Sequence, residues 1–140
     1  MKIDERALAV AAFEARERAY TPYSHFKVGA ALLTSDGKIY TGCNIENAAY
    51  SVAVCAERTA LFKAVSEGER SFAALAVVGS FEGEVNALPS APCGICRQAL
   101  VEFCPLDMPV IMAKTPDDRI VMRLEELLPL SFGPENLKQK

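Results

Sequence analysis

The sequence predicts an α/β protein with one mixed five-stranded sheet and helices on its faces. Three observations support this fold class. Apolar segments of strand length alternate with segments of helical periodicity, in the order helix, two strands, helix, strand, helix, two strands. The 140 residues suit one domain, expected over residues 1–140. Apolar residues make up 51% of the chain, which is enough to bury a hydrophobic core.

In the first half of the chain, the limits of the elements are marked by capping and turn residues. Asp4 is a favourable N-cap, and the residues beyond it are apolar at helical spacing. Pro22 favours an end to this helix, and Asp36-Gly37 is typical of a hairpin turn. The segment 27–34 is almost continuously apolar, as in a strand buried on both faces. The expected elements are a helix over 5–18, strands over 27–34 and 39–43, a loop over 44–54 and a helix over 55–67.

In the second half of the chain, proline and turn residues again mark the limits of the elements. Pro105 ends a helical segment, and Pro116-Asp117-Asp118 separates two short apolar segments as a turn. The expected elements are a buried strand over 72–79, a loop over 82–92, a helix over 93–104, strands over 109–113 and 119–122, and a short helix over 124–128.

Charge and composition exclude several classes of partner. The net charge is −3 and the pI is near 5.2, without the basic stripe of a protein that grips nucleic acid. No segment approaches the roughly 18 apolar residues of a membrane span, and the first residues are charged and lack the apolar run expected of a signal peptide. We therefore expect a cytoplasmic protein with no nucleic acid polymer and no membrane as partner. Its five cysteines would be reduced there.

Three of the cysteines stand at the expected starts of two helices. Cys93 and Cys96 share one face of a first helical turn, and Cys55 opens the other helix. Helix N-termini favour thiolates, and catalytic zinc sites use three protein ligands. A fourth cysteine would close the site and make it structural. Cys104 lies about two turns beyond Cys96, too far to join, whereas the spacing does not exclude Cys43.

Glu57 favours a catalytic site over a structural one. It lies two residues after Cys55, where a carboxylate can reach a metal-activated water without binding the metal. The simpler alternative is a first-turn glutamate that interacts with the helix dipole. The presence of the Cys93-x-x-Cys96 pair favours the catalytic interpretation of Glu57 over that alternative.

The combination of Cys55-Ala56-Glu57 with Pro92-Cys93-Gly94-Ile95-Cys96 resembles the signature of zinc nucleoside deaminases. The similarity to the small homotetrameric cytidine deaminases covers nearly the whole chain. Its further motifs are residues 21–32, 42–50, 58–61, Arg97-Gln98 and 127–134.

This resemblance implies a three-layer cytidine-deaminase-like fold and one Zn²⁺ per chain. It implies hydrolysis of free cytidine and deoxycytidine to the uridines and ammonia by zinc-activated water, in pyrimidine salvage, by a homotetramer with sites shared across interfaces. Cys55, Cys93 and Cys96 would bind zinc, and Glu57 would shuttle protons. The implied substrate-binding residues are Asn44 and Glu46 for a sugar hydroxyl, the Ala56 backbone for the base, Phe26 against the pyrimidine, and Phe132 stacking on it from a neighbouring subunit.

Several residues have simpler alternatives. Zinc with three thiolates carries a charge of −1, which Arg58 would offset by hydrogen bonds to sulfur, unless it is a surface arginine. Asn44 and Glu46 lie two apart at a strand end and point the same way, but such a pair also occurs in solvated loops. Phe26 and Phe132 are compatible with packing in the core and the tail.

Tyr50 is compatible with either core packing or a place at the site across an interface. His25 is the only histidine, and we interpret it as structural or solvent-facing. Among rival functions, a blasticidin-S-type nucleoside deaminase shares the metal signature, but the Asn44-x-Glu46-Asn47 segment argues against it. The other rival is a non-catalytic structural-zinc module.

Overall fold

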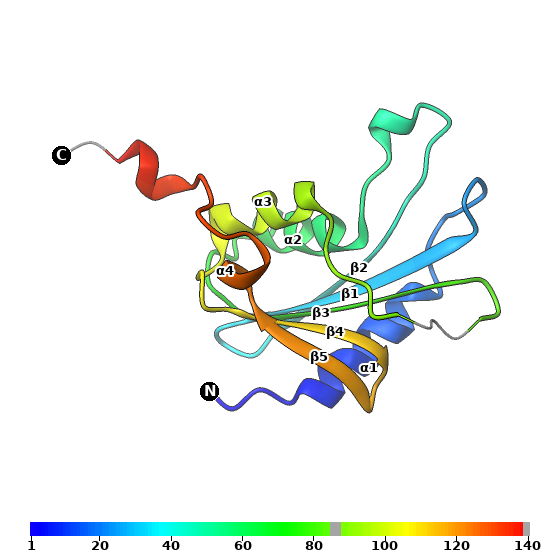
Figure 1. Ribbon diagram of the computed structural model, residues 1–140, viewed down its shortest axis with the longest axis horizontal. Helices are drawn as coiled ribbons and strands as arrows, with labels where there is room; N and C mark the ends of the chain where they lie inside the picture. The colour runs from blue at the N-terminus through cyan, green and yellow to red at the C-terminus, as the bar shows by residue number, and fades with distance from the viewer. Residues whose placement is uncertain (85–87, 139–140) are drawn as a thin grey trace.

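The computed structural model describes residues 1–84 and 88–138, and a five-stranded sheet forms its centre (Figure 1). The strand order is β2-β1-β3-β4-β5. The β3 and β4 strands are parallel, and the other neighbours are antiparallel, so the expected mixed sheet is confirmed. The strands are β1 (Phe26–Thr34), β2 (Ile39–Cys43), β3 (Phe72–Phe81), β4 (Pro109–Thr115) and β5 (Asp118–Arg123).

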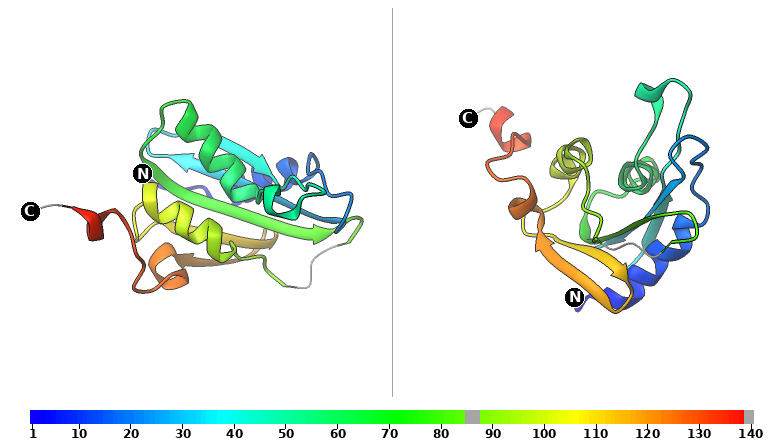
Figure 2. Two further views of the ribbon diagram at one scale, coloured as in Figure 1. Left: turned by 90° about the horizontal axis from the view of Figure 1, so that it is seen from above. Right: turned by 45° about the vertical axis from the view of Figure 1, so that its right-hand side comes forward.

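Helices cover both faces of the sheet and give the molecule three layers. The two further views show α2 and α3 side by side on one face and α1 on the other (Figure 2). Over the described residues, every helix is too short or too polar to cross a membrane. The helices are α1 (Glu5–Arg16), α2 (Ala56–Ser66), α3 (Gly94–Phe103) and the short α4 (Leu124–Leu127), with 3₁₀ turns η1 (Tyr50–Val52) and η2 (Pro134–Leu137).

The apolar character of β1 follows from its central position between the two helical layers. Ala30 and Leu32 belong to the larger core cluster, which includes the inner faces of α2 and α3. Ala31 and Leu33 point to the opposite side and pack with Leu8 of α1. Since successive side chains of a strand point to opposite faces, a strand with helices on both sides needs apolar residues throughout.

The main differences from the expected elements lie at their ends. The first helix ends at Arg16, two residues earlier than expected, and continues as a turn. The β3 strand extends to Phe81 because β1 begins at Phe26 and pairs with it there. The η1 and η2 turns were not expected from the sequence pattern, since neither has helical periodicity. Within the expected loop 82–92, residues 85–87 lie outside the described residues.

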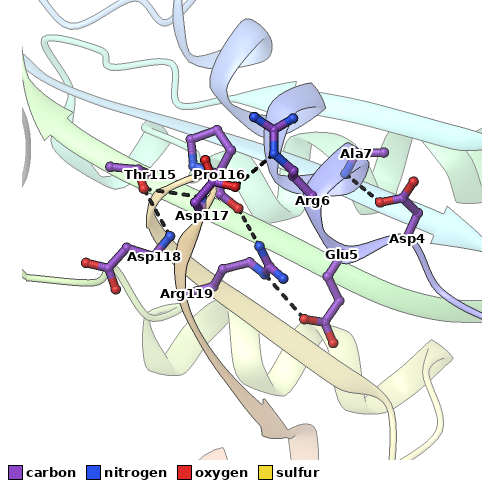
Figure 3. A network of polar contacts seen from close by, with 9 residues as sticks. All are labelled: Asp4, Glu5, Arg6, Ala7, Thr115, Pro116, Asp117, Asp118 and Arg119. Carbon is purple, nitrogen blue, oxygen red and sulfur yellow. Dashed lines mark hydrogen bonds and ion pairs between the residues drawn. The ribbon is translucent and has the colours of Figure 1, made fainter.

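Polar contacts join the N-terminus to the turn between β4 and β5 (Figure 3). The Asp4 carboxylate caps α1 by accepting from the Ala7 N–H at 3.0 Å, as the sequence predicts. Arg6 pairs with Asp117 at 2.9 Å, and Glu5 with Arg119 at 3.3 Å. The Arg6–Asp117 pair is largely exposed, and such pairs contribute at most about 1 kcal/mol each to stability.

Glycine at position 42 allows α2 to lie directly on the sheet. A Cβ atom at Gly42 would lie 2.5 Å from the Ala56 carbonyl oxygen and 2.5 Å from the Ala60 nitrogen. Both atoms belong to the backbone of α2, so they cannot move aside as a flexible side chain could. The first turn of α2, which follows Cys55, is therefore held against β2 by direct backbone contact.

We expect Gly42→Ala to lower the free energy of unfolding by about 1–3 kcal/mol, because overpacking forces the helix away from the strand. Urea unfolding followed by circular dichroism measures this change. Gly94→Ala is the matched control, since nothing lies within 4 Å of the added methyl group. An unfolding midpoint for Gly42→Ala equal to that of the parent protein would contradict the close-contact argument.

Candidate metal centre

Three thiols meet where the N-termini of α2 and α3 converge. Cys55 is the N-cap of α2, Cys93 is the N-cap of α3, and Cys96 lies buried in the first turn of α3. Their sulfur atoms all lie within 4.8 Å of one another, and Cys55 Sγ and Cys93 Sγ are 3.6 Å apart. Zinc–sulfur bonds of about 2.3 Å place the sulfurs of a tetrahedral site roughly 3.8 Å apart, so the cluster fits zinc.

The two remaining cysteines do not join this cluster. Among residues 1–84 and 88–138, Cys55, Cys93 and Cys96 form the only group of potential ligand side chains close enough to share a metal. Cys104 packs in the hydrophobic core, where burial raises its pKa to about 12. Cys43, which the spacing did not exclude, ends β2 outside the cluster. Three protein ligands are typical of a catalytic zinc site, whereas structural sites use four.

Negative charge on the cluster is stabilised by its surroundings. The hydrogen bond with Cys96 lowers the pKa of Cys55 to about 5, and the same contact raises the pKa of Cys96. Arg58 Nη2 donates a hydrogen bond to Cys55 Sγ at 3.6 Å. The partial positive charge of two helix N-termini acts in the same direction. These groups oppose the −1 charge of a zinc ion with three thiolates.

Glu57 is a buried carboxyl group beside the thiols. Its side chain lies in the first turn of α2, and only 4% of the residue is exposed. Burial raises the pKa of Glu57 to about 7, and its Oε1 atom has no hydrogen-bond partner within the described part of the chain. A buried carboxyl group of this kind can both accept and return a proton near neutral pH. Its position is not that of a dipole-stabilising glutamate on the surface.

A cavity of about 390 Å³ joins these groups to the expected substrate-binding residues. Its size suits a small molecule. A larger hollow of about 690 Å³ lies between α3 and the C-terminal segment, but it is bordered by none of the three clustered thiols. The chemistry therefore identifies the smaller cavity as the site. It is lined by Cys55, Cys93, Glu57, Phe26, Asn44, Glu46 and Ala56, together with Val28, Ala53, Val54, Val77, Ser90 and Ala91.

Asn44 and Glu46 hold the segment that carries Phe26, which the sequence did not reveal. The Asn44 amide accepts from the Val28 N–H at 2.8 Å and donates to the Phe26 carbonyl oxygen at 2.9 Å. Glu46 Oε1 accepts from the backbone N–H groups of Tyr23 and Ser24 at 3.0 and 3.1 Å. The two side chains are therefore an ordered part of the cavity wall and not a solvated loop pair.

The aromatic residues differ in their relation to the cavity. Phe26 packs edge-to-face on Phe81 with ring centroids 5.0 Å apart, and its ring forms part of the wall. Phe132 is 60% exposed on a C-terminal segment that extends away from the sheet (Figure 1), and it is not among the described residues lining its own chain's cavity. Tyr50 is 77% exposed and contacts Tyr23, so core packing of Tyr50 is wrong.

Sequence reasoning missed Ser24 and Ser90. Ser90 lines the cavity from the segment before Pro92, and Ser24 contacts Glu46 from the loop before β1. Serines in loops are common, and no spacing rule singles them out. Only their place in motifs that adjoin known site residues could have drawn attention to them. His25 is exposed, as expected.

Comparison with known proteins agrees with this geometry. Residues 1–112 match the family model described as the cytidine and deoxycytidylate deaminase zinc-binding region. The chain is 53% identical to the cytidine deaminase of Sporosarcina psychrophila over 96% of each chain. It is 47% identical to that of Halalkalibacterium halodurans, over 96% of this chain and 98% of the relative.

A solved cytidine deaminase from Burkholderia pseudomallei has the same fold, with 49% identity, a TM-score of 0.84 and coverage of 93% of this chain and all of that one. The three-thiol cluster, the buried carboxyl group and these similarities lead to one assignment. The chain belongs to the cytidine and deoxycytidylate deaminase family and is a zinc-dependent hydrolytic deaminase.

Proposed function

We propose that this protein converts free cytidine and deoxycytidine to uridine and deoxyuridine, with release of ammonia, in pyrimidine salvage. The observation that carries the proposal is the buried Glu57 carboxyl group beside three clustered thiols in a cavity of nucleoside size. A purely structural zinc site would require neither the cavity nor an unpartnered carboxyl group. The 53% identity to a cytidine deaminase supports this substrate over blasticidin S.

Cys55, Cys93 and Cys96 would hold one zinc ion per chain. When bound, zinc acts as a Lewis acid that makes a water molecule acidic enough to supply a nucleophile near neutral pH. Arg58 is a positioning residue in this scheme, because its hydrogen bond to Cys55 Sγ offsets the charge of the thiolates.

Glu57 moves the protons of the reaction. Its carboxylate takes a proton from the attacking water and delivers it to the ring nitrogen next to the carbon that bears the amino group. It then transfers the second proton to the departing amine, so that water and cytidine yield uridine and ammonia. A pKa near 7 suits a group that alternates between the two protonation states.

The substrate would be recognised at both ends. Asn44 and Glu46 would bind a sugar hydroxyl, the Ala56 backbone would contact the base, and Phe26 would pack against the pyrimidine. Within the part of the chain that the structure describes, the hydrogen bonds already made leave the Asn44 amide one N–H and leave Glu46 Oε2 one acceptor position. The negative charge of Glu46 would repel a substrate phosphate.

Assembly into a homotetramer would complete the site. Phe132 is exposed on an extended segment and, by the family resemblance, would stack on the base bound to a neighbouring subunit. Other exposed apolar side chains also favour burial between subunits. They include Tyr50, Ile95, Leu130 and Leu137. None of the five cysteines is in a disulfide, and reduced cysteines suit the proposed cytoplasmic location.

The role of Glu57 is tested by Glu57→Gln, which keeps the size of the side chain. We expect this variant to retain one zinc per chain but to lose at least ~10²–10⁴-fold in kcat, because it cannot carry a proton. Turnover of cytidine is followed by absorbance, and zinc by atomic absorption. Glu102→Gln, an exposed residue of α3, serves as the control. A Glu57→Gln variant within tenfold of the parent would remove Glu57 from the mechanism.

The substrate class is tested by comparing cytidine, deoxycytidine, CMP and blasticidin S. We expect kcat/KM for CMP to be lower than for cytidine by roughly 100-fold or more, because a phosphate near the Glu46 carboxylate meets a like charge. Glu46→Gln should reduce the difference in kcat/KM between CMP and cytidine. Deamination of CMP as fast as cytidine would refute the nucleoside assignment.

Sharing of sites between subunits is tested through Phe132. We expect Phe132→Ala to reduce kcat/KM by roughly 5- to 150-fold, the range for a lost aromatic–base stack. Glu57→Ala subunits reassembled with Phe132→Ala subunits should then exceed the summed activity of the parents, because some sites combine an intact Glu57 with a neighbour's intact Phe132. If mixed tetramers form without this gain, Phe132 does not act across the interface.

A further inference from the structure

The loop between α1 and β1 lies beside the segment that contains Glu46. Tyr20 and Ile45 form a bridge between the two segments, and the Glu46 N–H donates to the Tyr20 carbonyl oxygen at 2.9 Å. In Figure 1 the two loops appear together at the same end of the sheet, in blue and blue-green. The contacts between them decide how the Glu46 carboxylate and the Phe26 ring are placed relative to each other.

One side chain, Ser24, connects these two residues. Its hydroxyl donates to Glu46 Oε2 and accepts from the Phe26 N–H at 3.0 Å. The Ser24 N–H also donates to Glu46 Oε1. Ser24 does not line the catalytic cavity and instead borders a neighbouring hollow with Glu46 and Tyr23. It therefore contacts two cavity-lining residues from outside the cavity.

The backbone between Ser24 and Phe26 has an uncommon conformation at His25. His25 has φ of 59°, in the left-handed region that non-glycine residues seldom adopt. Its N–H donates to the Thr21 carbonyl oxygen at 3.1 Å, and its carbonyl oxygen accepts from the Glu82 N–H at 2.9 Å. The hydrogen bond from Phe26 to Ser24 spans this residue. It thus fixes the direction in which the chain enters β1 and presents the Phe26 ring.

The hydrogen bonds of Glu46 show what the serine hydroxyl adds. Oε1 accepts two backbone N–H groups, which fill its usual acceptor positions. Among residues 1–84 and 88–138, Oε2 accepts only from Ser24, so one acceptor position is left for a ligand. The hydrogen bond from the Ser24 hydroxyl therefore sets the orientation of the remaining acceptor position of Glu46 Oε2. The same hydrogen bond is the main reason why the pKa of Glu46 lies below its usual value.

We propose that Ser24 is a positioning residue for nucleoside deamination, which orients the Glu46 carboxylate toward the sugar and the Phe26 ring toward the base through one hydroxyl group. The inference rests on the proposed function, because it takes the sugar and base contacts of these two residues from it. Ser24 touches neither the reacting atoms nor the metal ligands. Its loss therefore affects substrate binding more than the chemical step.

The first test compares Ser24→Ala with variants that keep part of the contact. Ser24→Ala should raise KM for cytidine roughly tenfold, as expected for a lost hydrogen bond to a charged group, and change kcat less than about threefold. Ser24→Thr keeps the hydroxyl and should return KM to within about threefold of the parent. Ser24→Cys keeps the size with a weaker donor and should lie between them. Ser66→Ala removes an exposed serine hydroxyl bonded to the Lys63 carbonyl oxygen and is the control.

The second test asks whether Ser24 acts through Glu46. In a double-mutant cycle, Ser24→Ala should cost at least threefold less in kcat/KM when Glu46 is already alanine, because coupled residues are not additive. The proposal would be overturned if Ser24→Ala lowered kcat/KM equally with Glu46 present and with Glu46→Ala, or if Ser24→Ala left KM unchanged. Failure of Ser24→Thr to restore KM would do the same.

Zinc content and thermal unfolding of each variant separate positioning from folding. If Ser24→Ala does not fold, Ser24→Cys is compared with Ser24→Thr instead. A higher KM for Ser24→Cys than for Ser24→Thr then supports the positioning role, and equal KM values overturn it. If the parent protein does not deaminate cytidine, the proposed function itself fails. If the parent is active and the Ser24 variants behave like it, only the positioning role is refuted.

Discussion

The site depends on the convergence of two helix N-termini on one face of the sheet. Cys55 and Cys93 each occupy the N-cap position of a helix, and their sulfur atoms lie 3.6 Å apart. Three thiolates so close together would repel one another strongly without compensation. The helix N-termini and Arg58 supply that compensation, and the backbone contact at Gly42 keeps the first turn of α2 in place. The position of Glu57 follows, because it lies on the same turn.

Much of the fold could be predicted because local patterns and tertiary packing agree. The uninterrupted apolar run of β1 indicated burial on both faces, and helices do cover both of its faces. Asp4 predicted the start of α1, and Pro105 the end of α3. The metal ligands could be predicted because thiol spacing on a helix is local. Only the contact between Cys55 and the Cys93–Cys96 pair required the whole fold.

The features that could not be predicted depend on hydrogen bonds between distant loops. No periodicity reveals that the Asn44 amide and the Glu46 carboxylate bind the backbone of residues 23–28, since partners about 20 residues apart leave no local pattern. The positive φ of His25 is a further case. Glycine is the residue that most often marks such a backbone conformation in a sequence, and position 25 is a histidine. Tyr50 was ambiguous because aromatic residues occur both in cores and at interfaces.

The Asn44 side chain also has a consequence for solubility. The β2 strand ends at Cys43, one residue before its register would reach Val28 of β1. The Asn44 amide then takes the place of a strand, because it pairs with both the Val28 N–H and the Phe26 carbonyl oxygen. Unpaired backbone groups at a sheet edge invite strands from other molecules, which leads to aggregation. The mouth of the cavity can thus remain open to a ligand while the adjoining stretch of β1 offers no such edge.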